Sequence, residues 1–243
     1  MSTITDPIAV ARQAAEDFKI CYGADLLSLI IYGSAAGGHF DPKKSDINLL
    51  VLLTEMTLPM IEKSEKFQEK WMEKRFARLL FMDKEYINSA LDSFPIEFLA
   101  MKGSYIVIFG EDVLKDIRID DRELQIQVER ELRGKWLHLL REWPVAKQNP
   151  RLLRSLLHSS MRDFSAIFQA LLHLKNQTVS PERKSLFAEV TKNYGLEEGA
   201  LLRTMEAVKS GNKKEMVAIF PAYVQAIKTL IVTVDQFPIK EQA

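Results

Sequence analysis

The residues best suited to chemistry lie in one stretch between positions 29 and 51. Residues 29–34 read Leu-Ile-Ile-Tyr-Gly-Ser, and after eleven further residues Asp46 begins the run Asp-Ile-Asn-Leu-Leu-Val. Gly33 and Ser34 can bring backbone N–H groups and a hydroxyl close to a phosphate. Because side chains alternate along a strand, Asp46 and Asn48 point to the same side of a sheet. The pattern indicates a binding site for a divalent cation beside a turn that binds a phosphate.

The elements that must position this turn are two strands and the helices around them. Residues 26–32 and 47–53 are apolar runs of strand length with turn residues between them. Asp6 and Pro7 predict the start of a first helix, which ends at Gly23. Thr57 predicts the start of one long helix through about Arg78. The remaining predictions in this half are strands over residues 79–82, 96–101 and 105–109, with a short helix over 86–91.

Strand signals stop near residue 120, and helical spacing of apolar residues takes over. One long helix is predicted to end near Pro144, and a second long helix is predicted from about residue 153. Gly195 and Gly211 separate the later helices. We therefore predict an α+β chain, with a mixed-sheet domain over residues 1–120 and an all-α helical bundle over 121–243.

The turn and the second strand resemble the signature of the nucleotidyltransferase fold in the DNA polymerase beta superfamily. Gly33, Ser34 and Asp46 match it, whereas Asn48 replaces the second carboxylate. The helical half is similar to that of small bacterial members such as the aminoglycoside nucleotidyltransferases. The resemblance implies that Gly33 and Ser34 hold the phosphates of a nucleoside triphosphate and that the Asp46 and Asn48 positions bind Mg²⁺.

The resemblance also implies a third carboxylate on a later strand, which helps activate an acceptor hydroxyl. Glu97, in the strand predicted over residues 96–101, is the candidate for this position and for a metal ligand. Lys44, with Lys43 beside it, lies where a basic side chain can reach a triphosphate. Asp46 and Glu97 are thus the expected catalytic residues.

Asn48 leaves two functions open. The first is transfer of a nucleoside monophosphate, with AMP favoured, from a magnesium–triphosphate complex to the hydroxyl of an unidentified acceptor. The second is a catalytically impaired relative that acts as a nucleotide-binding, regulatory or toxin–antitoxin-type interaction module. The choice depends on Asn48 because an amide oxygen brings no charge to a cation whose affinity depends on ligand charge.

Composition limits the partners and the compartment. Lys and Arg number 33 and so do Asp and Glu, so the chain lacks the basic excess typical of nucleic-acid binding. Its apolar runs are shorter than a membrane span, and the single cysteine, Cys21, favours a cytoplasmic protein without an internal disulfide. Residues 1–120 carry 14 basic and 19 acidic side chains, and the rest carries 19 and 14, which fits an acidic metal-binding half and a basic helical half. The sequence leaves open whether the chain forms a homodimer.

Overall fold

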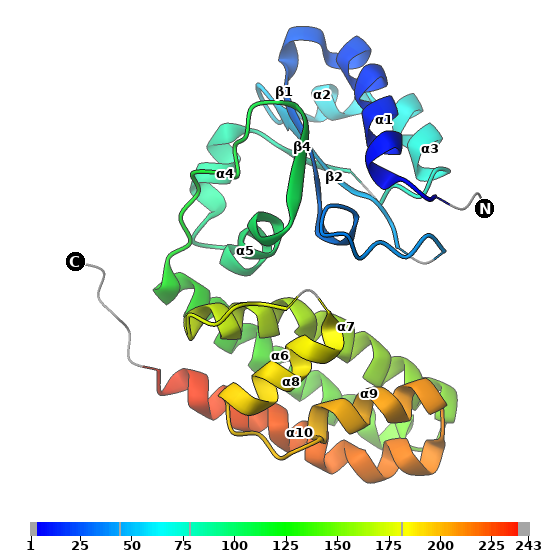
Figure 1. Ribbon diagram of the computed structural model, residues 1–243, viewed down its shortest axis with the longest axis vertical. Coiled ribbons are helices and arrows are strands. Elements are labelled where there is room, and N and C mark those ends of the chain that lie inside the picture. The colour runs from blue at the N-terminus through cyan, green and yellow to red at the C-terminus, as the bar shows by residue number, and fades with distance from the viewer. Residues whose placement is uncertain (1–3, 44, 78, 181, 238–243) are drawn as a thin grey trace. The chain divides into compact units, whose positions relative to one another are not determined.

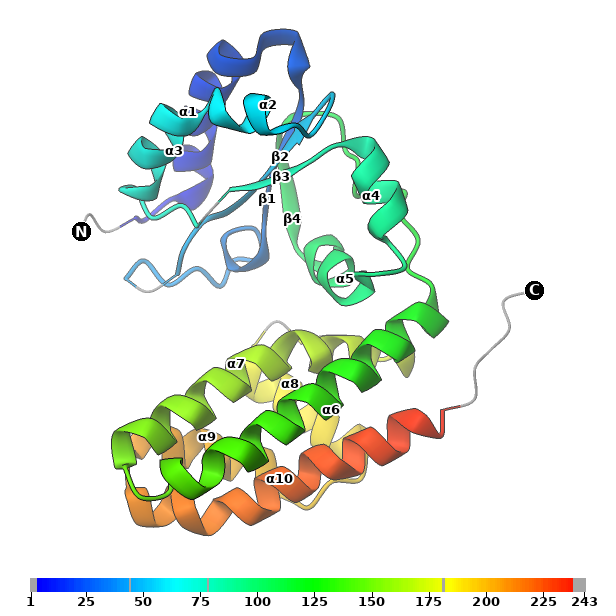
Figure 2. The ribbon, with the colours of Figure 1, turned by 180° about the vertical axis from the view of Figure 1, so that it is seen from behind.

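The computed structural model describes residues 4–43, 45–77, 79–180 and 182–237. The chain forms two compact units, of which one contains Met1–Asp92 and Glu97–Ile119 and the other Ser93–Ile96 and Asp120–Ala243. The first unit is built on a four-stranded mixed sheet, and the second is helical (Figures 1 and 2). The predicted α+β class is confirmed.

The sheet unit alternates strands with short helices. Its strands are β1 (Leu26–Tyr32), β2 (Asn48–Leu53), β3 (Leu80–Met82) and β4 (Tyr105–Gly110). Its helices are α1 (Pro7–Tyr22), α2 (Leu58–Glu62), α3 (Glu65–Met72), α4 (Lys84–Ala90) and α5 (Pro95–Gly103), with short 3₁₀ turns η1 (Gly23–Asp25) and η2 (Gly33–Ala35). The side chain of Asp6 accepts a hydrogen bond from the Ala9 N–H and so caps α1, as the Asp6–Pro7 pair predicts.

The strand order is β3-β2-β1-β4. Strand β1 runs antiparallel to both β2 and β4, whereas β2 and β3 are parallel. Register pairs Tyr32 at the end of β1 with Asn48 at the start of β2. This pairing places the beginning of β2 beside the turn that follows β1.

Both faces of the sheet are buried, which explains why β1 and β2 are continuous apolar runs. Leu29 and Val51 pack into a core with α1 and α3, whereas Ile30 and Leu50 pack into a second core with α4 and α5. The helices cover the two faces accordingly (Figure 1). Asn48 shares the strand parity of Leu50 and therefore lies on the face covered by α4 and α5.

Two predicted elements in this unit are wrong. Residues 96–101 form part of helix α5 and not a strand, so Glu97 lies in the first turn of a helix. A short apolar run does not distinguish a strand from a buried helix, and Pro95 together with the helix-forming residues after Ile96 favours the helix. The long helix predicted from Thr57 is two helices, α2 and α3, with Ser64 between them, and the predicted end at Arg78 lies outside the described residues.

The second unit is a bundle whose helices bury one another's apolar faces. They are α6 (Asp121–Ala146), α7 (Pro150–Leu174), α8 (Arg183–Asn193), α9 (Ala200–Ser210) and α10 (Lys213–Asp235). Aromatic rings fill the interior, with Trp143 stacked on Phe220 at 4.0 Å and Phe168 edge-on to Phe187 at 4.8 Å between centroids. The buried hydroxyl of Tyr223 is satisfied by Ser160 Oγ at 3.0 Å.

Helix α10 is long and apolar enough to cross a membrane by length and composition alone. Its side chains nevertheless pack into the bundle: Phe220, Tyr223, Ile227 and Leu230 are all buried against neighbouring helices. The core helix of a water-soluble bundle passes the same test of length and composition. We therefore describe α10 as a core helix of this unit.

Candidate nucleotide-binding site

The turn after β1 is a fixed loop. Gly33 has a φ of +74°, a conformation that glycine adopts without steric cost. Its N–H donates to the carbonyl of Ser104 at 2.9 Å, and its carbonyl accepts the N–H groups of Ala36 and Gly37, each at 3.0 Å. Ser104 Oγ also donates to the Gly33 carbonyl at 3.3 Å. The residues just before β4 therefore hold the turn in place.

Asn48 lies directly against this turn. A Cβ atom added to Gly33 would be 3.1 Å from Asn48 Nδ2, a tight contact that would displace the amide by a few tenths of an ångström. The structure thus brings together two of the predicted site positions. Burial raises the pKa of Tyr32, the residue that precedes Gly33, above the ordinary tyrosine value.

Asp46 lies two residues before Asn48 and is largely in solvent, with 63% of its side chain exposed. Its Oδ1 is 3.9 Å from Nε of Arg75, whose side chain is only 10% exposed. Arg75 Nη1 and Nη2 also donate to the carbonyls of Pro42 and Ser45 at 2.7 and 2.6 Å. Sequence reasoning missed Arg75 because its position fell within a predicted helix.

The predicted basic residues lie on the connection that Arg75 holds. The Lys43 side chain is exposed, and its N–H donates to Asp41 Oδ1 at 2.8 Å. Lys44 lies outside the described residues. Ser34 is half-buried within η2. The phosphate-contacting roles of Lys44, Gly33 and Ser34 stay predictions.

Glu97 is exposed on α5, whereas the next residue, Phe98, is buried against the sheet. Because it is carried by a helix, Glu97 does not occupy the strand position that the resemblance requires of a third carboxylate. Its role as a catalytic residue and metal ligand stays a prediction. The segment parallel to β2, residues 76–82, contains no Asp or Glu that could serve instead.

The donor set fits a pair of magnesium ions poorly. Asp46 supplies one carboxylate and Asn48 an uncharged amide, while a guanidinium lies beside Asp46. Among the residues that the structure describes, no three His, Cys, Asp or Glu side chains form a group that could hold a metal ion. Two-ion catalysis needs several negative ligands to hold the cations together. Asp46, Asn48 and Glu97 do not provide them in this arrangement.

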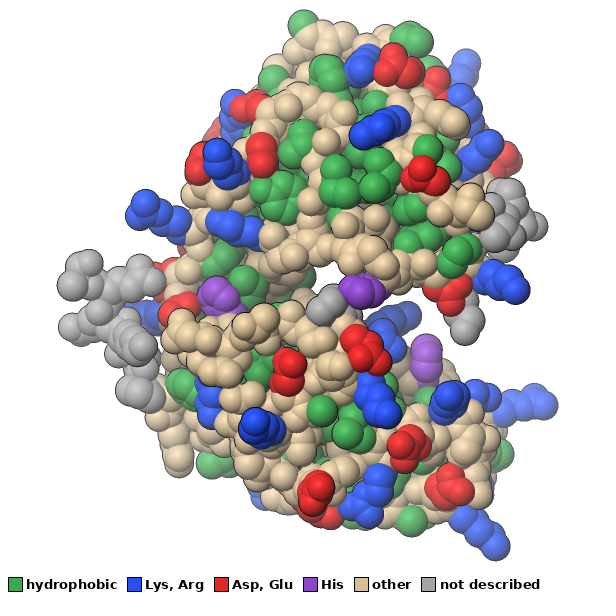
Figure 3. Space-filling view, in the orientation of Figure 1, with side chains coloured by type: hydrophobic (Ala, Val, Ile, Leu, Met, Phe, Trp, Pro, Cys, Tyr) green, Lys and Arg blue, Asp and Glu red, His purple; other side chains and the backbone are tan. Residues whose placement is uncertain are grey.

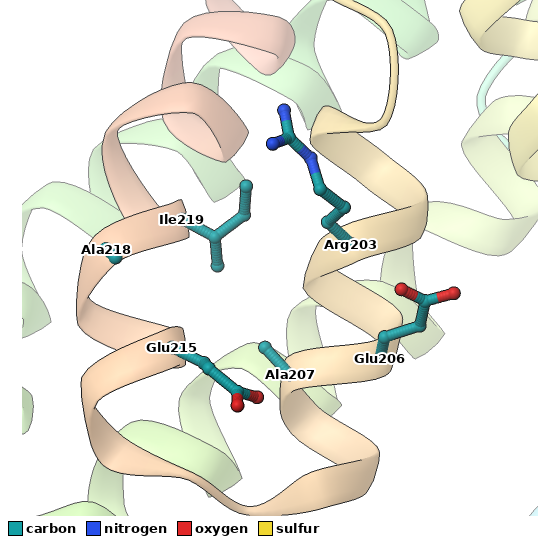
Figure 4. Close-up of a pocket in the computed structure, with 6 residues that line it drawn as sticks. All are labelled: Arg203, Glu206, Ala207, Glu215, Ala218 and Ile219. Carbon is teal, nitrogen blue, oxygen red and sulfur yellow. The ribbon is translucent and has the colours of Figure 1, made fainter.

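A cavity of about 340 Å³ lies in the helical unit between α9 and α10 (Figure 4). It is lined by Arg203, Glu206 and Ala207 of α9 and by Glu215, Ala218 and Ile219 of α10. Two of its charged side chains, Arg203 and Glu215, are engaged within the chain. Arg203 Nη2 is 3.3 Å from Glu197 Oε1, and Glu215 accepts hydrogen bonds from Ser210 and Asn212 at the start of α10. These contacts stabilise helix ends.

The helical unit carries more basic than acidic side chains, but they do not form one positive patch on the face drawn in Figure 3. Acidic and basic side chains are interspersed over that face. Pairs four residues apart along α6 explain part of this mixture. Arg133 lies 2.6 Å from Glu129, and Lys135 lies 3.3 Å from Glu131. Exposed pairs of this kind add little stability, but they neutralise each other's charge.

Comparison with known proteins identifies the fold. No protein-family model matches the chain, and no curated protein matches it. Among solved structures, the chain shares its fold with an adenyltransferase, in agreement with the fold that the resemblance of the glycine turn and Asp46 implies. One such structure is spectinomycin adenyltransferase AAD(9) from Enterococcus faecialis with ATP and spectinomycin. It matches with a TM-score of 0.52 and 10% identity, covering 89% of this chain and 97% of that chain. At this identity the likeness concerns the fold.

Proposed function

We propose that this chain binds a nucleoside triphosphate at the turn of Gly33 and Ser34 and has little or no nucleotidyl-transfer activity. The observation that carries the proposal is the set of groups beside the turn. Asp46 is the one carboxylate of the matched motif, Asn48 is neutral, and Arg75 lies 3.9 Å from Asp46. Such a set of groups is compatible with an anionic ligand, but its affinity for the Mg²⁺ ions that drive nucleotidyl transfer is low.

The geometry of the turn supports the binding part of the proposal. Gly33 lacks a side chain at the point where Asn48 packs, so the amide of Asn48 lies directly against the turn and a ligand at this position would meet both. Hydrogen bonds to Ser104 fix the turn before any ligand arrives, which lowers the entropic cost of binding. The similar adenyltransferase, whose structure contains ATP, shares this fold.

A second candidate is transfer itself, with AMP passing from a magnesium–triphosphate complex to an acceptor hydroxyl. It is favoured by the extent of the likeness, since 97% of the adenyltransferase chain is covered and that structure contains both ATP and a hydroxyl-bearing compound, spectinomycin. In this case Asp46 and Glu97 would be catalytic and Asn48 a neutral ligand. The impaired form would act instead as a regulatory or interaction module.

Calorimetric titration of the full chain with ATP tests the binding proposal. We expect saturable binding, weakened about fivefold in Ser34→Ala because a hydrogen bond to a charged group contributes ~1 kcal/mol or more. Ser89→Ala is the matched control, because the Ser89 hydroxyl donates only to the Tyr86 carbonyl within α4. Absence of ATP binding by the native chain would refute the proposal.

Pyrophosphate release separates binding from transfer. The native chain and Asn48→Asp are incubated with Mg²⁺, ATP and mixtures of hydroxyl-bearing acceptors. We expect no release above background by the native chain, because Asn48 leaves the site one carboxylate short. Release by the native chain would establish the second candidate, and release by Asn48→Asp alone would show that the charge at position 48 is what the native chain lacks.

A further inference from the structure

The Arg75 side chain is buried and held by several contacts. Its guanidinium contacts three residues of the connection between the turn and β2, namely Pro42, Ser45 and Asp46. The side chain is nine-tenths buried although it carries a permanent charge. The connection is also closed on itself, since the Ser45 N–H donates to the Asp41 carbonyl at 2.9 Å. Arg75 therefore anchors Pro42, Ser45 and Asp46, the residues of this connection that it contacts.

The backbone of Arg75 is strained as well. Its φ is +63°, in the left-handed region where a residue other than glycine is disfavoured. The position is held by parallel pairing with the start of β2: the Ile47 N–H donates to the Arg75 carbonyl and the Ala77 N–H to the Ile47 carbonyl, each at 2.9 Å. This pairing places Arg75 next to Asp46 in space although 28 residues separate them in the sequence.

The charges at the site balance without a metal ion. Two carboxylates and one divalent cation sum to zero, and so do the single carboxylate of Asp46, the neutral amide of Asn48 and the guanidinium of Arg75. Without Arg75, the exposed carboxylate of Asp46 would repel an incoming phosphate chain. A bound cation or a fixed positive side chain can each remove that repulsion.

We propose that Arg75 takes the place of the metal cation, so that this site binds a nucleoside triphosphate without Mg²⁺. Arg75 neutralises Asp46 and holds the connection that carries Lys43 in position. It is a positioning residue, because its guanidinium donates hydrogen bonds to the Pro42 and Ser45 carbonyls and forms an ion pair with Asp46. The inference rests on the proposed triphosphate binding at the Gly33 turn, and it specifies how that binding depends on cations.

The first test needs no variant. ATP is titrated into the full chain in EDTA and, separately, in Mg²⁺, at low and at physiological ionic strength. We expect affinities within about twofold of each other in EDTA and Mg²⁺, and weaker binding at higher salt because the charges are partly in water. Binding that appears only with Mg²⁺ would overturn this inference and leave the proposed function intact. No binding in either solution would overturn both.

The second test separates charge from scaffolding. Arg75→Met removes the guanidinium, and we expect ATP affinity in EDTA to fall about tenfold at low salt and about threefold at physiological salt, as for a charge screened by water. Adding Asp46→Asn to Arg75→Met should restore most of the affinity, because the uncompensated carboxylate is gone. If the double variant binds as weakly as Arg75→Met, neutralisation of Asp46 is not the role of Arg75.

Two further variants guard against loss of folding. Arg75→Gly also removes the guanidinium but relieves the strain of a positive φ, so it should lose affinity like Arg75→Met while keeping the fold. Arg203→Met is the matched control, because Arg203 likewise bonds a carboxylate, that of Glu197, and a carbonyl, that of Glu198. Equal loss of ATP affinity in Arg203→Met would show that the effect of Arg75 is not local, and would overturn the proposal.

Discussion

Replacing Gly33 by alanine tests whether the turn owes its shape to the absence of a side chain. The φ of +74° at this position disfavours alanine, which costs about 1 kcal/mol relative to glycine. Gly211 offers a close match, since its φ is +70° in the helical unit. Both replacements therefore have a similar backbone cost, and any difference between them reports on the surroundings.

The surroundings differ by packing. At Gly211 the nearest atom to an added Cβ is Arg154 Nη1 at 3.7 Å, an ordinary contact, whereas at Gly33 it is Asn48 Nδ2 at 3.1 Å. Asn48 must therefore move by a few tenths of an ångström in Gly33→Ala. We expect Gly211→Ala to lower the free energy of unfolding by about 1 kcal/mol and Gly33→Ala by about 1–3 kcal/mol, since overpacking adds to the strain.

The assay combines hydrogen exchange with ligand binding. Hydrogen exchange measured by peptide resolves the sheet unit from the helical unit, which a single unfolding midpoint would not do in a chain of two units. Gly33→Ala should accelerate exchange in β1 and β2 and weaken ATP binding, and Gly211→Ala should accelerate exchange in α9 only. Equal ATP affinities for Gly33→Ala and the native chain would refute the idea that a ligand approaches this backbone closely.

Three further predictions concern polar groups that are buried or partly buried. Gln127→Met removes the acceptor of the buried Ile96 N–H, bonded at 2.8 Å, and should cost about 1–3 kcal/mol with faster exchange of that amide; unchanged exchange would contradict it. Burial raises the pKa of Tyr223 above its ordinary value of 10.0, so the hydroxyl ionises at lower pH in the unfolded chain than in the folded one. The free energy of unfolding, measured by urea titration, should therefore fall as pH rises above about 10. The fall should be less steep in Tyr223→Phe. Loss of the Tyr223 hydroxyl should itself lower the free energy of unfolding by only ~1 kcal/mol near neutral pH, because Ser160 keeps its hydrogen bond to a backbone carbonyl. An identical decrease of stability with pH in Tyr223→Phe would show that Tyr223 is not the group that titrates. Burial also raises the pKa of Cys21, so alkylation of the native thiol at pH 8 should be slower than in urea, and equal rates would show that the thiol is not shielded.

The sequence predicts the strands of the candidate site well because their signals are local. Strand β1 begins and ends at the predicted residues, 26 and 32, and β2 begins one residue after its predicted start at Ile47. Each is a run of apolar residues with turn residues on either side, and burial on both faces requires such a run. The turn between them follows from the same pattern.

Helix α5 and Arg75 show where local signals are insufficient. Residues 96–101 are apolar enough for either a strand or a buried helix, and the choice depends on packing with Ile30 and Leu50 from distant parts of the chain. Arg75 lies in a charged stretch of good helix formers, yet it adopts a left-handed backbone because Ile47 pairs with Phe76. Neither contact is encoded in nearby residues, so neither could be found by periodicity.

The two departures from the carboxylate pair act in the same direction. Asn48 removes one negative charge from the matched motif, and Arg75 adds one positive charge beside Asp46. On the proposed function, each change would lower the affinity of the site for a divalent cation and raise its affinity for a phosphate chain that arrives without one. A site that had merely lost its metal through Asn48 would keep an uncompensated Asp46. The proposed metal-free site requires that this carboxylate be compensated, and Arg75 beside it supplies the positive charge.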